Sequence, residues 1–468
     1  MGLEAGVGVY FWGFLIVYGV VMYVLSPTAR TPASFFRGAD AQGRAASQWM
    51  LTASIFISWI FAKSVTNAAN LGAAYGIVGG LAYATYWLSI PLAGWVIYRL
   101  RTRLGAHGLV PFLIARYGRT AAFAFSVAIL IRLYNEVWSN TAVVGGYFGP
   151  SGSTPFIAAA LLFTAVTLCY SIKGGLRSSI FTDAIQAGIF VVFLGVVLFY
   201  VLPTHGAPAL LASGEFRLNA GVDLLLVAAL QILSYPFHDP VLTDRGFITE
   251  EKRMLKAFAW SGALGFLCVL AFSLVGVHAR LEGIAVSDNV PAGVAGALGL
   301  GALVVMTVVM ISAAGSTLDS TFSSLAKSIA QELPMLAGRT PGRHAMRIGV
   351  VTMIAFALLG NLPMIAGTDI LKATTVSGTM VMGLAPIFLL AGLARPPSPW
   401  SFHLAFWPGI VLGILLTLGW VPQSWAIGDG KYALLLGVNL YGLALCTAGF
   451  LLPLLILRRT GERIANPA

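Results

Sequence analysis

The sequence predicts an all-α, polytopic membrane protein, and its composition and apolar pattern lead to this fold class. Hydrophobic residues make up 58% of the 468 positions and charged residues only 10%, whereas soluble proteins carry roughly 25% charged residues. Apolar runs of about 20 residues recur from end to end, and each is long enough to cross a bilayer as a helix. Residues 1–468 are therefore expected to form a single integral membrane domain.

The apolar runs predict thirteen transmembrane helices. We expect them at residues 7–25, 48–73, 78–99, 120–148, 155–171, 180–202, 221–243, 257–279, 300–330, 347–366, 370–394, 402–421 and 433–456. The first run has Glu4 before it, no preceding basic residue and no small-residue cleavage site. It is therefore expected to be a retained helix rather than a signal peptide.

Lysine and arginine concentrate in every second loop between these helices. The basic loops contain Arg30, Arg37, Arg44, Arg99, Arg101, Arg103, Arg116, Arg119, Lys173, Arg177, Arg245, Lys252, Arg253, Lys256, Arg339, Arg343, Arg347, Arg395, Arg458, Arg459 and Arg463. The alternate loops contain little beyond Arg217, Arg280, Lys372 and Lys431. The positive-inside rule then places the N-terminus outside and the C-terminus inside. This topology accounts for the net charge of +11 without a nucleic-acid partner.

Three basic residues lie within predicted helices. Lys63 interrupts an apolar stretch and is followed by Ser64, Thr66, Asn67 and Asn70. A lysine at the bilayer centre costs about 2.5–3.5 kcal/mol on insertion scales, so it needs a partner or a function. Lys327 lies near a cytoplasmic helix end, where its ammonium can reach the interface.

Arg132 also needs a partner. Glu136 follows it by four residues on the same helical face, which permits an ion pair. Either a structural pair or the lining of a pocket fits this pattern. One turn into the sixth helix, Asp183 and Gln186 lie three residues apart. Asp183 is either a functional carboxylate or a solvated residue near the positive end of the helix dipole.

The seventh predicted helix contains two prolines, Pro236 and Pro240, which flank His238 and Asp239. Prolines four residues apart remove two backbone donors and favour a break in the helix. Broken backbone at membrane depth is tolerated only beside protein or a wet cavity. A simple kink near the cytoplasmic end is the alternative.

The ninth predicted helix carries an oxygen-rich face. Its polar side chains recur at helical spacing and are Ser316, Thr317, Asp319, Ser320 and Ser323. Such a face suits a hard cation such as Na⁺, although serines in membrane helices also bond their own backbone carbonyls or permit close packing. A further hydroxyl and glycine cluster occupies residues 373–386. Polar patches on separate helices, two of them interrupted, are typical of secondary transporters with a midplane site.

Other function classes have weaker support. The three cysteines show no metal-ligand spacing, and the chain contains neither HExxH nor GxSxG, so we expect no enzyme and no cofactor. A transporter-like sensor is the remaining alternative, and it would need a separate signalling partner. We expect the protein to contact a small solute and membrane lipid, with no obligate protein partner, as a multi-pass protein of a cell membrane such as the bacterial inner membrane.

Several segments resemble the sodium/solute symporter family, which includes sodium/proline and sodium/sugar symporters. The similar segments are "YSIKGGLRSSIFTDAIQAGIF", "GSTLDSTFSSLAKSIAQEL", "GLVPFLIARYG" and "GAAYGIVGGLAY". In addition, "PFHDPVLTDRGF" is similar to a proline-transporter motif, Phe-x-Gln-Pro followed by Arg five residues later. The resemblance spans about residues 10–395 in the right order.

This resemblance implies a LeuT-type fold with two inverted repeats of five helices. The repeats would be residues 48–202 and 221–394, preceded by the helix at 7–25 and followed by two helices within 402–456. The first helix of each repeat would be interrupted.

The resemblance also implies an ion site. Sodium would bind the carbonyls of Trp59 and Ala62 together with Ala313, Ser316 and Thr317 of the eighth core helix. Asp183 matches an acidic residue that is tied to ion coupling in some family members.

The sequence departs from the family pattern at four positions near the predicted breaks. Phe61 and Lys63 replace polar and small residues, while His238 and Asp239 replace the Gly and Gln of the second break. Lys63 then has three interpretations. It anchors a solute carboxylate, it substitutes for or competes with sodium in a proton-coupled transporter, or it pairs with Asp239 or Asp319 and locks two helices.

The predicted function is cation-coupled symport of a small polar organic solute by alternating access. Sodium is the expected coupling ion, and a proton-coupled or sodium-independent transporter with Lys63 in place of sodium is the alternative. The solute is expected to lie near Thr66, Asn67, Glu136, Tyr235 and His238. Because few aromatic residues are expected there, an amino acid or carboxylate is favoured over a sugar.

Overall fold

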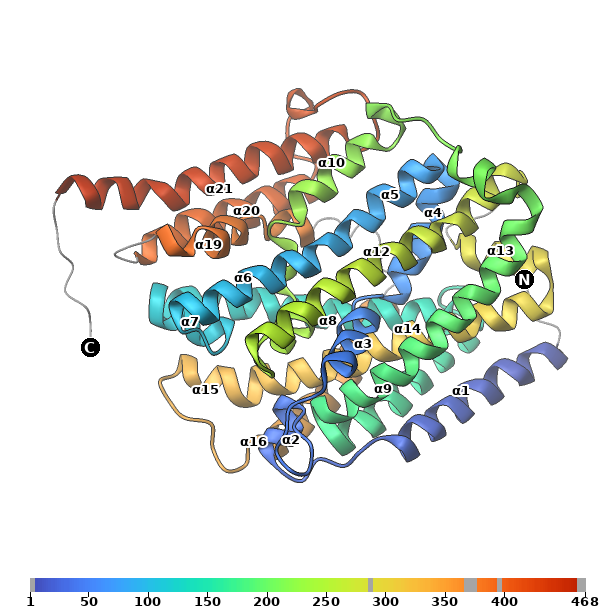
Figure 1. The fold of residues 1–468 in the computed structure, drawn as a ribbon, viewed down its shortest axis with the longest axis horizontal. Helices are drawn as coiled ribbons and strands as arrows, with labels where there is room; N and C mark the ends of the chain where they lie inside the picture. The colour runs from blue at the N-terminus through green and yellow to red at the C-terminus, as the bar shows by residue number, and fades with distance from the viewer. Residues whose placement is uncertain (1–4, 285–288, 366–376, 394–397, 461–468) are drawn as a thin grey trace.

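The fold is a bundle of helices that run mainly along one common direction (Figure 1). The computed structural model describes residues 5–284, 289–365, 377–393 and 398–460, and these residues contain helices and no strand. α1 (Ala5–Leu25) begins at one end of the bundle, and α21 (Ala433–Thr460) ends at the opposite end. The predicted all-α class is confirmed.

The first half of the chain forms mostly long helices. After α1 these are α2 (Pro32–Arg37), α3 (Gln48–Ser58), α4 (Ala62–Tyr75), α5 (Ile77–Ala84), η1 (Thr85–Leu88), α6 (Ser89–Leu104), α7 (Leu109–Tyr117), α8 (Arg119–Gly145) and α9 (Thr154–Leu211).

The second half contains more short segments. They are η2 (Leu218–Ala220), α10 (Val222–Gln231), η3 (Tyr235–His238), α11 (Pro240–Thr243), η4 (Asp244–Phe247), α12 (Glu251–Leu281), α13 (Val290–Leu298), α14 (Leu300–Lys327), η5 (Ser328–Glu332), α15 (Leu333–Leu336), α16 (Ala345–Leu359), α17 (Leu362–Ile365), α19 (Leu384–Leu389), η6 (Ala391–Leu393), α20 (Pro399–Thr417) and η7 (Gln423–Trp425), followed by α21.

Eight helices of the described residues are long and apolar enough to cross a membrane, and the bent pair α3–α4 makes a possible ninth span. The chain is thus a multi-pass membrane protein. The count of thirteen spans and the outside position of the N-terminus remain predictions. Part of the predicted helix at 370–394, with Lys372 and residues 373–376, lies outside the described residues.

One predicted loop is a kink instead. The helices expected at 155–171 and 180–202 are joined in α9, which bends at Gly175. This residue has φ 53° and ψ −139°, a conformation that favours glycine. A side chain at Gly175 would also overlap the ring of Phe35. The kink therefore lets α9 continue on both sides of a close contact with α2.

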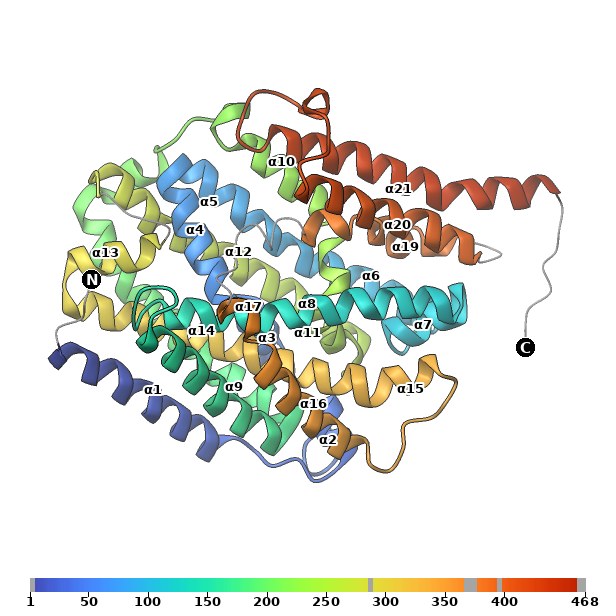
Figure 2. The same cartoon turned by 180° about the vertical axis from the view of Figure 1, so that it is seen from behind.

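Two other helices are interrupted, as predicted. α3 and α4 meet at a bend of 60°, and Phe61 is extended there, with φ −63° and ψ 145°. The second interruption separates α10 from α11, where η3 begins next to Pro236 and ends before Pro240. Figure 2 shows the neighbouring helices α8 and α14 running through the middle of the bundle.

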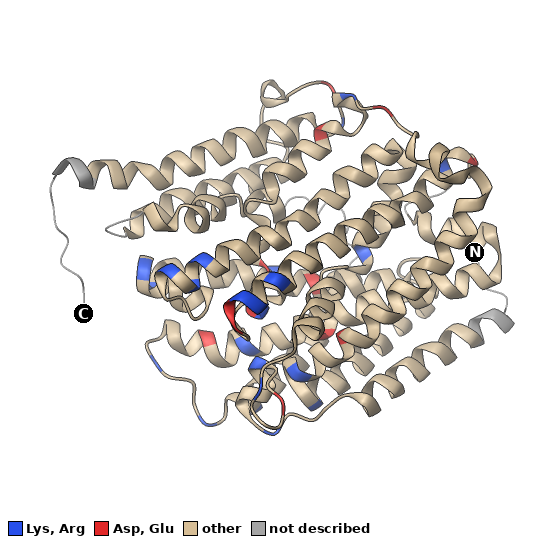
Figure 3. Cartoon of the chain, in the orientation of Figure 1, with Lys and Arg blue, Asp and Glu red and all other residues tan. Residues whose placement is uncertain are grey.

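Charged residues are distributed unevenly along the bundle. Figure 3 shows lysine and arginine gathered mainly at one end, around α6, α7 and the start of α12. This end is the one that the positive-inside rule assigns to the cytoplasm. We call it the basic end.

Close packing holds α4 against α12. A Cβ added to Gly72 would overlap the Ser273 carbonyl oxygen, and one added to Gly276 would overlap the Ala69 carbonyl oxygen. Backbone cannot move aside as a flexible side chain can. Both glycines are therefore needed for the backbones to approach this closely.

We predict that Gly276→Ala lowers the free energy of unfolding by about 1–3 kcal/mol, because the added methyl group forces α4 away from α12. Gly301→Ala is the matched control, since Gly301 is helical, exposed and has nothing within 4 Å of an added Cβ. Thermal unfolding in detergent measures both variants. Equal melting temperatures for the two would contradict the proposed packing constraint.

Candidate ion and solute site at two helix breaks

The two helix breaks contact each other. Trp59, at the end of α3, donates its indole Nε1–H to Asp239 Oδ2 over 3.0 Å. Asp239 also caps α11, because its Oδ1 accepts the Val241 backbone N–H over 3.0 Å. A helix N-terminus with free N–H groups favours a carboxylate. Each break is thus fixed by a residue of the other.

A buried charge network extends from Asp239 to Lys63. Lys63 Nζ lies 2.6 Å from Glu136 Oε1 and 3.2 Å from Ser139 Oγ. Arg132 contacts the same Glu136 oxygen, and its Nη2 lies 3.2 Å from Asp239 Oδ2. All four charged side chains are at most 3% exposed. The two cations and the two carboxylates neutralise each other, and their attraction offsets part of the free-energy cost of removing each charge from water.

These contacts correct one prediction and confirm another. The pairing of Lys63 with Asp239 or Asp319 is wrong, because Glu136 is its ion-pair partner. The predicted pair between Arg132 and Glu136 is confirmed. Glu136 pairs with both Lys63 and Arg132, because α8 passes next to the break beside Lys63.

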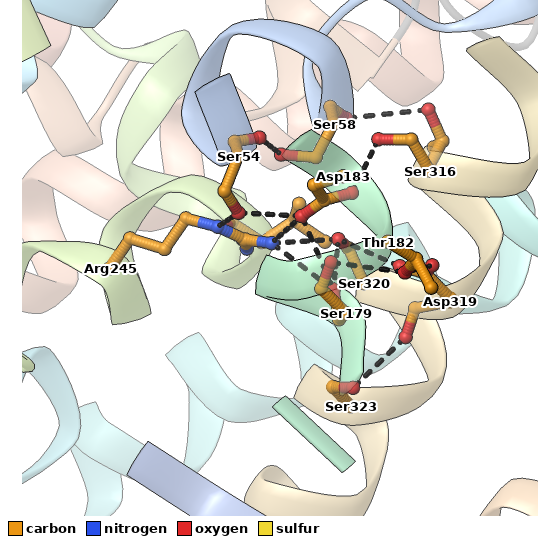
Figure 4. Close-up of polar contacts among 12 residues, drawn as sticks. Ser54, Ser58, Ser179, Thr182, Asp183, Arg245, Ser316, Asp319, Ser320 and Ser323 are labelled. Atoms are coloured by element: carbon orange, nitrogen blue, oxygen red, sulfur yellow. Dashed lines mark hydrogen bonds and ion pairs between the residues drawn. The ribbon is translucent and has the colours of Figure 1, made fainter. Parts of the chain in front are cut away.

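A second charge cluster lies against α3, whose Ser54 and Ser58 take part in it (Figure 4). Its cation is Arg245, which is fully buried. The Arg245 Nη2 lies 3.0 Å from Asp183 Oδ2 and 2.7 Å from Ser320 Oγ. Its Nε donates to Ser54 Oγ over 2.8 Å, and Ser54 donates in turn to Asp183 over 2.5 Å. The expectation that Arg245 is a loop residue of the basic end is therefore wrong.

Hydroxyls of α14 complete this cluster. Ser316 Oγ donates to Asp183 Oδ1 over 2.7 Å. Thr317 Oγ1 lies 3.3 Å from the Ser58 carbonyl oxygen and 3.1 Å from that of Ala313. The structure therefore brings Asp183, Ser316 and Thr317 to the end of α3, where a carbonyl oxygen is available.

The carbonyls of Trp59 and Ala62 stay predicted ligands of the ion. The carbonyl of the α3 end that Thr317 contacts is that of Ser58, one residue before Trp59. The Ala62 carbonyl accepts the Thr66 hydroxyl within α4 over 3.3 Å.

Asp319 gives the second cluster an excess of negative charge. Its side chain contacts hydroxyls, among them those of Thr182 at 2.9 Å, Ser320 at 3.3 Å and Ser179. The cluster thus holds two carboxylates and one guanidinium, which contacts Asp183 directly and reaches Asp319 through Ser320. With both carboxylates ionised, the cluster carries a net charge of −1, and buried net charge is costly.

A cavity lies beside Lys63 and is small. Its volume is 50 Å³, enough for only about four water molecules. Seven aromatic side chains line it, so the expectation of few aromatic residues is wrong. They are Trp59, Phe61, Tyr83, Tyr86, Trp87, Tyr235 and Tyr432. Lys63, Asn67 and Gln231 are polar members of the same lining.

The residues predicted to contact the solute do not all line the same cavity. Asn67 and Tyr235 line this aromatic cavity. Glu136 reaches it through Lys63, and Thr66 bonds its own helix. His238 instead lines a larger cavity of 850 Å³ between α8 and α20.

Sequence reasoning missed Arg245, Gln231 and the hydroxyls of Ser54 and Ser179. A signal for Arg245 was present, since it follows Pro240 by five residues in the family-like motif. Gln231 had no comparable signal, because its contacts with Tyr86 and Asn439 join distant parts of the chain.

We predict that Glu136→Gln lowers the free energy of unfolding by about 3–5 kcal/mol, because it leaves Lys63 buried without its carboxylate. Lys63→Met should cost less, since Glu136 then keeps Arg132. The double variant should be more stable than the sum of the single effects implies, with a coupling of roughly 1–3 kcal/mol.

Chemical denaturation in detergent micelles measures this cycle. Glu215→Gln is the control for the charge change, because among the described residues Glu215 pairs with Arg217 at an exposed position and its substitution should have little effect. Strict additivity of Lys63→Met and Glu136→Gln would show that the pair does not act as a unit.

Comparisons with known proteins bear on both fold and family. A family model described as "Sodium:solute symporter family" matches residues 41–242. Sodium/glucose cotransporter 1 of Oryctolagus cuniculus is 26% identical over 182 residues, 38% of this chain and 27% of that protein. Sodium/glucose cotransporter 4 of Danio rerio is 28% identical over 167 residues, 35% and 25% of the two chains. The matched part thus spans about a quarter of these relatives' length.

Solved structures extend the likeness over nearly the whole chain. A Na⁺-coupled sialic acid symporter in a substrate-bound, outward-open state has a TM-score of 0.70 at 15% identity, covering 96% of this chain and 97% of that one. A nucleobase-cation-symport-1 family transporter in a closed conformation has a TM-score of 0.57 at 12% identity, covering 92% and 96%. At these identities the likeness concerns the fold.

Proposed function

Because this chain resembles the sodium:solute symporter family and has a LeuT-type fold, we propose that it is a secondary active transporter that couples uptake of a small organic solute to entry of Na⁺. The observation that carries the proposal is the break between α3 and α4. On one side it presents the Ser58 carbonyl to Thr317, and on the other it positions Lys63 beside the aromatic cavity. An ion and a solute could therefore both act on the same few residues.

The charge balance supports a monovalent cation. The cluster of Asp183, Asp319 and Arg245 is short of one positive charge when both carboxylates are ionised. Its other groups are hydroxyl and carbonyl oxygens, which suit a hard cation. We place Na⁺ next to Asp183, Ser316 and Thr317. A proton would supply the same charge, so proton coupling is the alternative, and the described contacts hold Lys63 on Glu136 rather than in this cluster.

Coupling follows from the shared break. A cation between α3 and α14 stabilises the arrangement in which the α3 carbonyls face Thr317. A solute in the aromatic cavity favours a closed arrangement of α4, η1 and η3. If both ligands stabilise the same occluded state, each raises the other's affinity. The small volume of the cavity indicates that solute entry requires these segments to move apart.

The solute is proposed to be an amino acid or another carboxylate with an apolar body. Lys63 has three N–H donors, and its described hydrogen bonds, to Glu136 and Ser139, use two of them. The third could bind a carboxylate, while the aromatic lining contacts the rest of the solute. A sugar is the second candidate, because Asn67 and Gln231 place amides among those aromatic rings.

A transporter-like sensor would use the same ligand site without moving the solute. Uptake by purified protein in proteoliposomes separates the two, since a sensor binds without uptake. A thermal-shift screen of amino acids, monocarboxylates and sugars, each with and without Na⁺, selects the solute for that assay. We place the protein in a cell membrane, with the bacterial inner membrane as the proposed location.

We predict that an imposed inward Na⁺ gradient drives uptake in proteoliposomes and that a proton gradient alone does not. Asp319→Asn should remove most of the Na⁺ dependence, because it brings the second cluster to neutrality without a bound cation. Vesicles with equal Na⁺ on both sides are the control. Uptake driven by protons in Na⁺-free buffer would overturn the Na⁺ assignment.

Ser316→Ala is predicted to raise the Na⁺ concentration for half-maximal uptake by about tenfold, equivalent to about 1.4 kcal/mol, because one oxygen next to Asp183 is lost. Thr307→Ala is the matched control on the same helix, since Thr307 bonds only the Leu303 carbonyl among its described contacts. Similar Na⁺ dependence in both variants would place the ion elsewhere.

A further inference from the structure

Three side chains with metal-binding atoms meet at the end of the bundle opposite the basic end. His205 lies near the end of α9, His278 in the last turn of α12, and Glu282 directly after α12. The imidazole and carboxylate ligand atoms of all three lie within 4.8 Å of one another. None of these residues takes part in the ion or solute site described above.

Helical spacing and the packing of two helices bring these three side chains together. His278 and Glu282 are four residues apart, which places them on one face of the end of α12. His205 comes from α9, which packs against α12. It directly precedes Gly206, whose φ of 73° and ψ of 152° kink α9 at this point.

Two of the three groups already contact each other. The Nε2 of His205 lies 2.8 Å from Glu282 Oε1, and the imidazole rings of His205 and His278 have centroids 5.6 Å apart. The nearby cation Arg280 donates to the carbonyl oxygens of Ala73 and Ala74. The described contact of the Glu282 carboxylate is therefore with the imidazole of His205.

His278 provides an independent indication of a ligand. Its side chain is only 2% exposed, and its Nδ1 has no hydrogen-bond partner among the described residues. Buried polar atoms almost always have a partner, so an orphaned imidazole nitrogen requires an explanation. A metal ion that accepts its lone pair provides one.

We propose that His205, His278 and Glu282 bind a divalent transition-metal ion, with Zn²⁺ as the best match. Two imidazole nitrogens and one carboxylate leave a fourth, open position in a tetrahedral site. Ca²⁺ and Mg²⁺ prefer oxygen ligands and are disfavoured by the two imidazoles. Tetrahedral Zn²⁺ needs ligand atoms about 3.3 Å apart, so rotation of side chains at the bundle's end has to close the remaining gap.

The ion would connect two helices of the transport core. α9 carries Asp183 of the second cluster, and α12 packs against α4 through Gly276. A metal bridge between their ends would restrict relative movement of α9 and α12. This site is separate from the proposed Na⁺ position, and its existence does not depend on the transport function.

Calorimetric titration with ZnCl₂ tests the site directly. The full chain, purified in detergent without a histidine tag and treated with a chelator, should bind one Zn²⁺. His278→Ala and Glu282→Gln should each weaken binding at least about tenfold. His403→Ala is the matched control, because His403 lies on α20 and contacts Thr120 and Trp407, and it should leave the affinity unchanged.

Because His278 is buried, His278→Ala could fail to fold, so a second measurement uses thermal unfolding of the other variants. Zn²⁺ should raise the melting temperature of the wild type and of His403→Ala, but not that of Glu282→Gln, whose side chain is exposed. Absence of Zn²⁺ binding by the wild type would overturn the proposal. So would wild-type affinity in Glu282→Gln, or an equal loss in His403→Ala.

Discussion

The structure depends on the contacts that charged side chains make with one another when they are buried between helices. Seven charged side chains lie in two clusters on either side of the α3–α4 break, and none can be moved to water without rearranging helices. Lys63, Arg132, Glu136 and Asp239 form one cluster. Asp183, Asp319 and Arg245 belong to the other. The positions of α8, α9, α11 and α14 around the break follow from these contacts.

The break itself is what connects the clusters. A continuous helix would bond its own carbonyls and leave none for Thr317, and it would not place the indole of Trp59 on Asp239. With the break present, the Ser58 carbonyl and the Trp59 side chain point to different clusters. Movement of residues 59–61, between the end of α3 and the start of α4, can therefore alter both clusters. In the proposed function, this shared segment is the physical basis for coupling an ion to a solute.

Sequence patterns predicted the features that depend on residues close together in the chain. The prolines at 236 and 240 and the polar stretch after Lys63 indicated the two interruptions, and the four-residue spacing indicated the pair of Arg132 with Glu136. Partners from distant helices were not accessible in this way. Lys63 could have met any of several carboxylates, and only the path of α8 selects Glu136. Arg245 matched the loop pattern of the positive-inside rule, yet tertiary packing buries it completely. The aromatic lining was missed because its rings come from four stretches of the chain, at 59–61, 83–87, 235 and 432.

The departure of Lys63 from the family pattern has a consistent explanation in these charges. The positive charge of Lys63 at the break would repel Na⁺ if it were not neutralised, and this repulsion was the reason to consider proton coupling. However, Glu136 and Asp239 neutralise Lys63 together with Arg132, so this cluster as a whole is neutral. With both carboxylates ionised, the cluster around Asp183 still lacks one positive charge, because Arg245 is its one cation among the described residues. In the proposed function, Lys63 therefore acts on the solute side of the break, and the coupling cation binds in the cluster around Asp183.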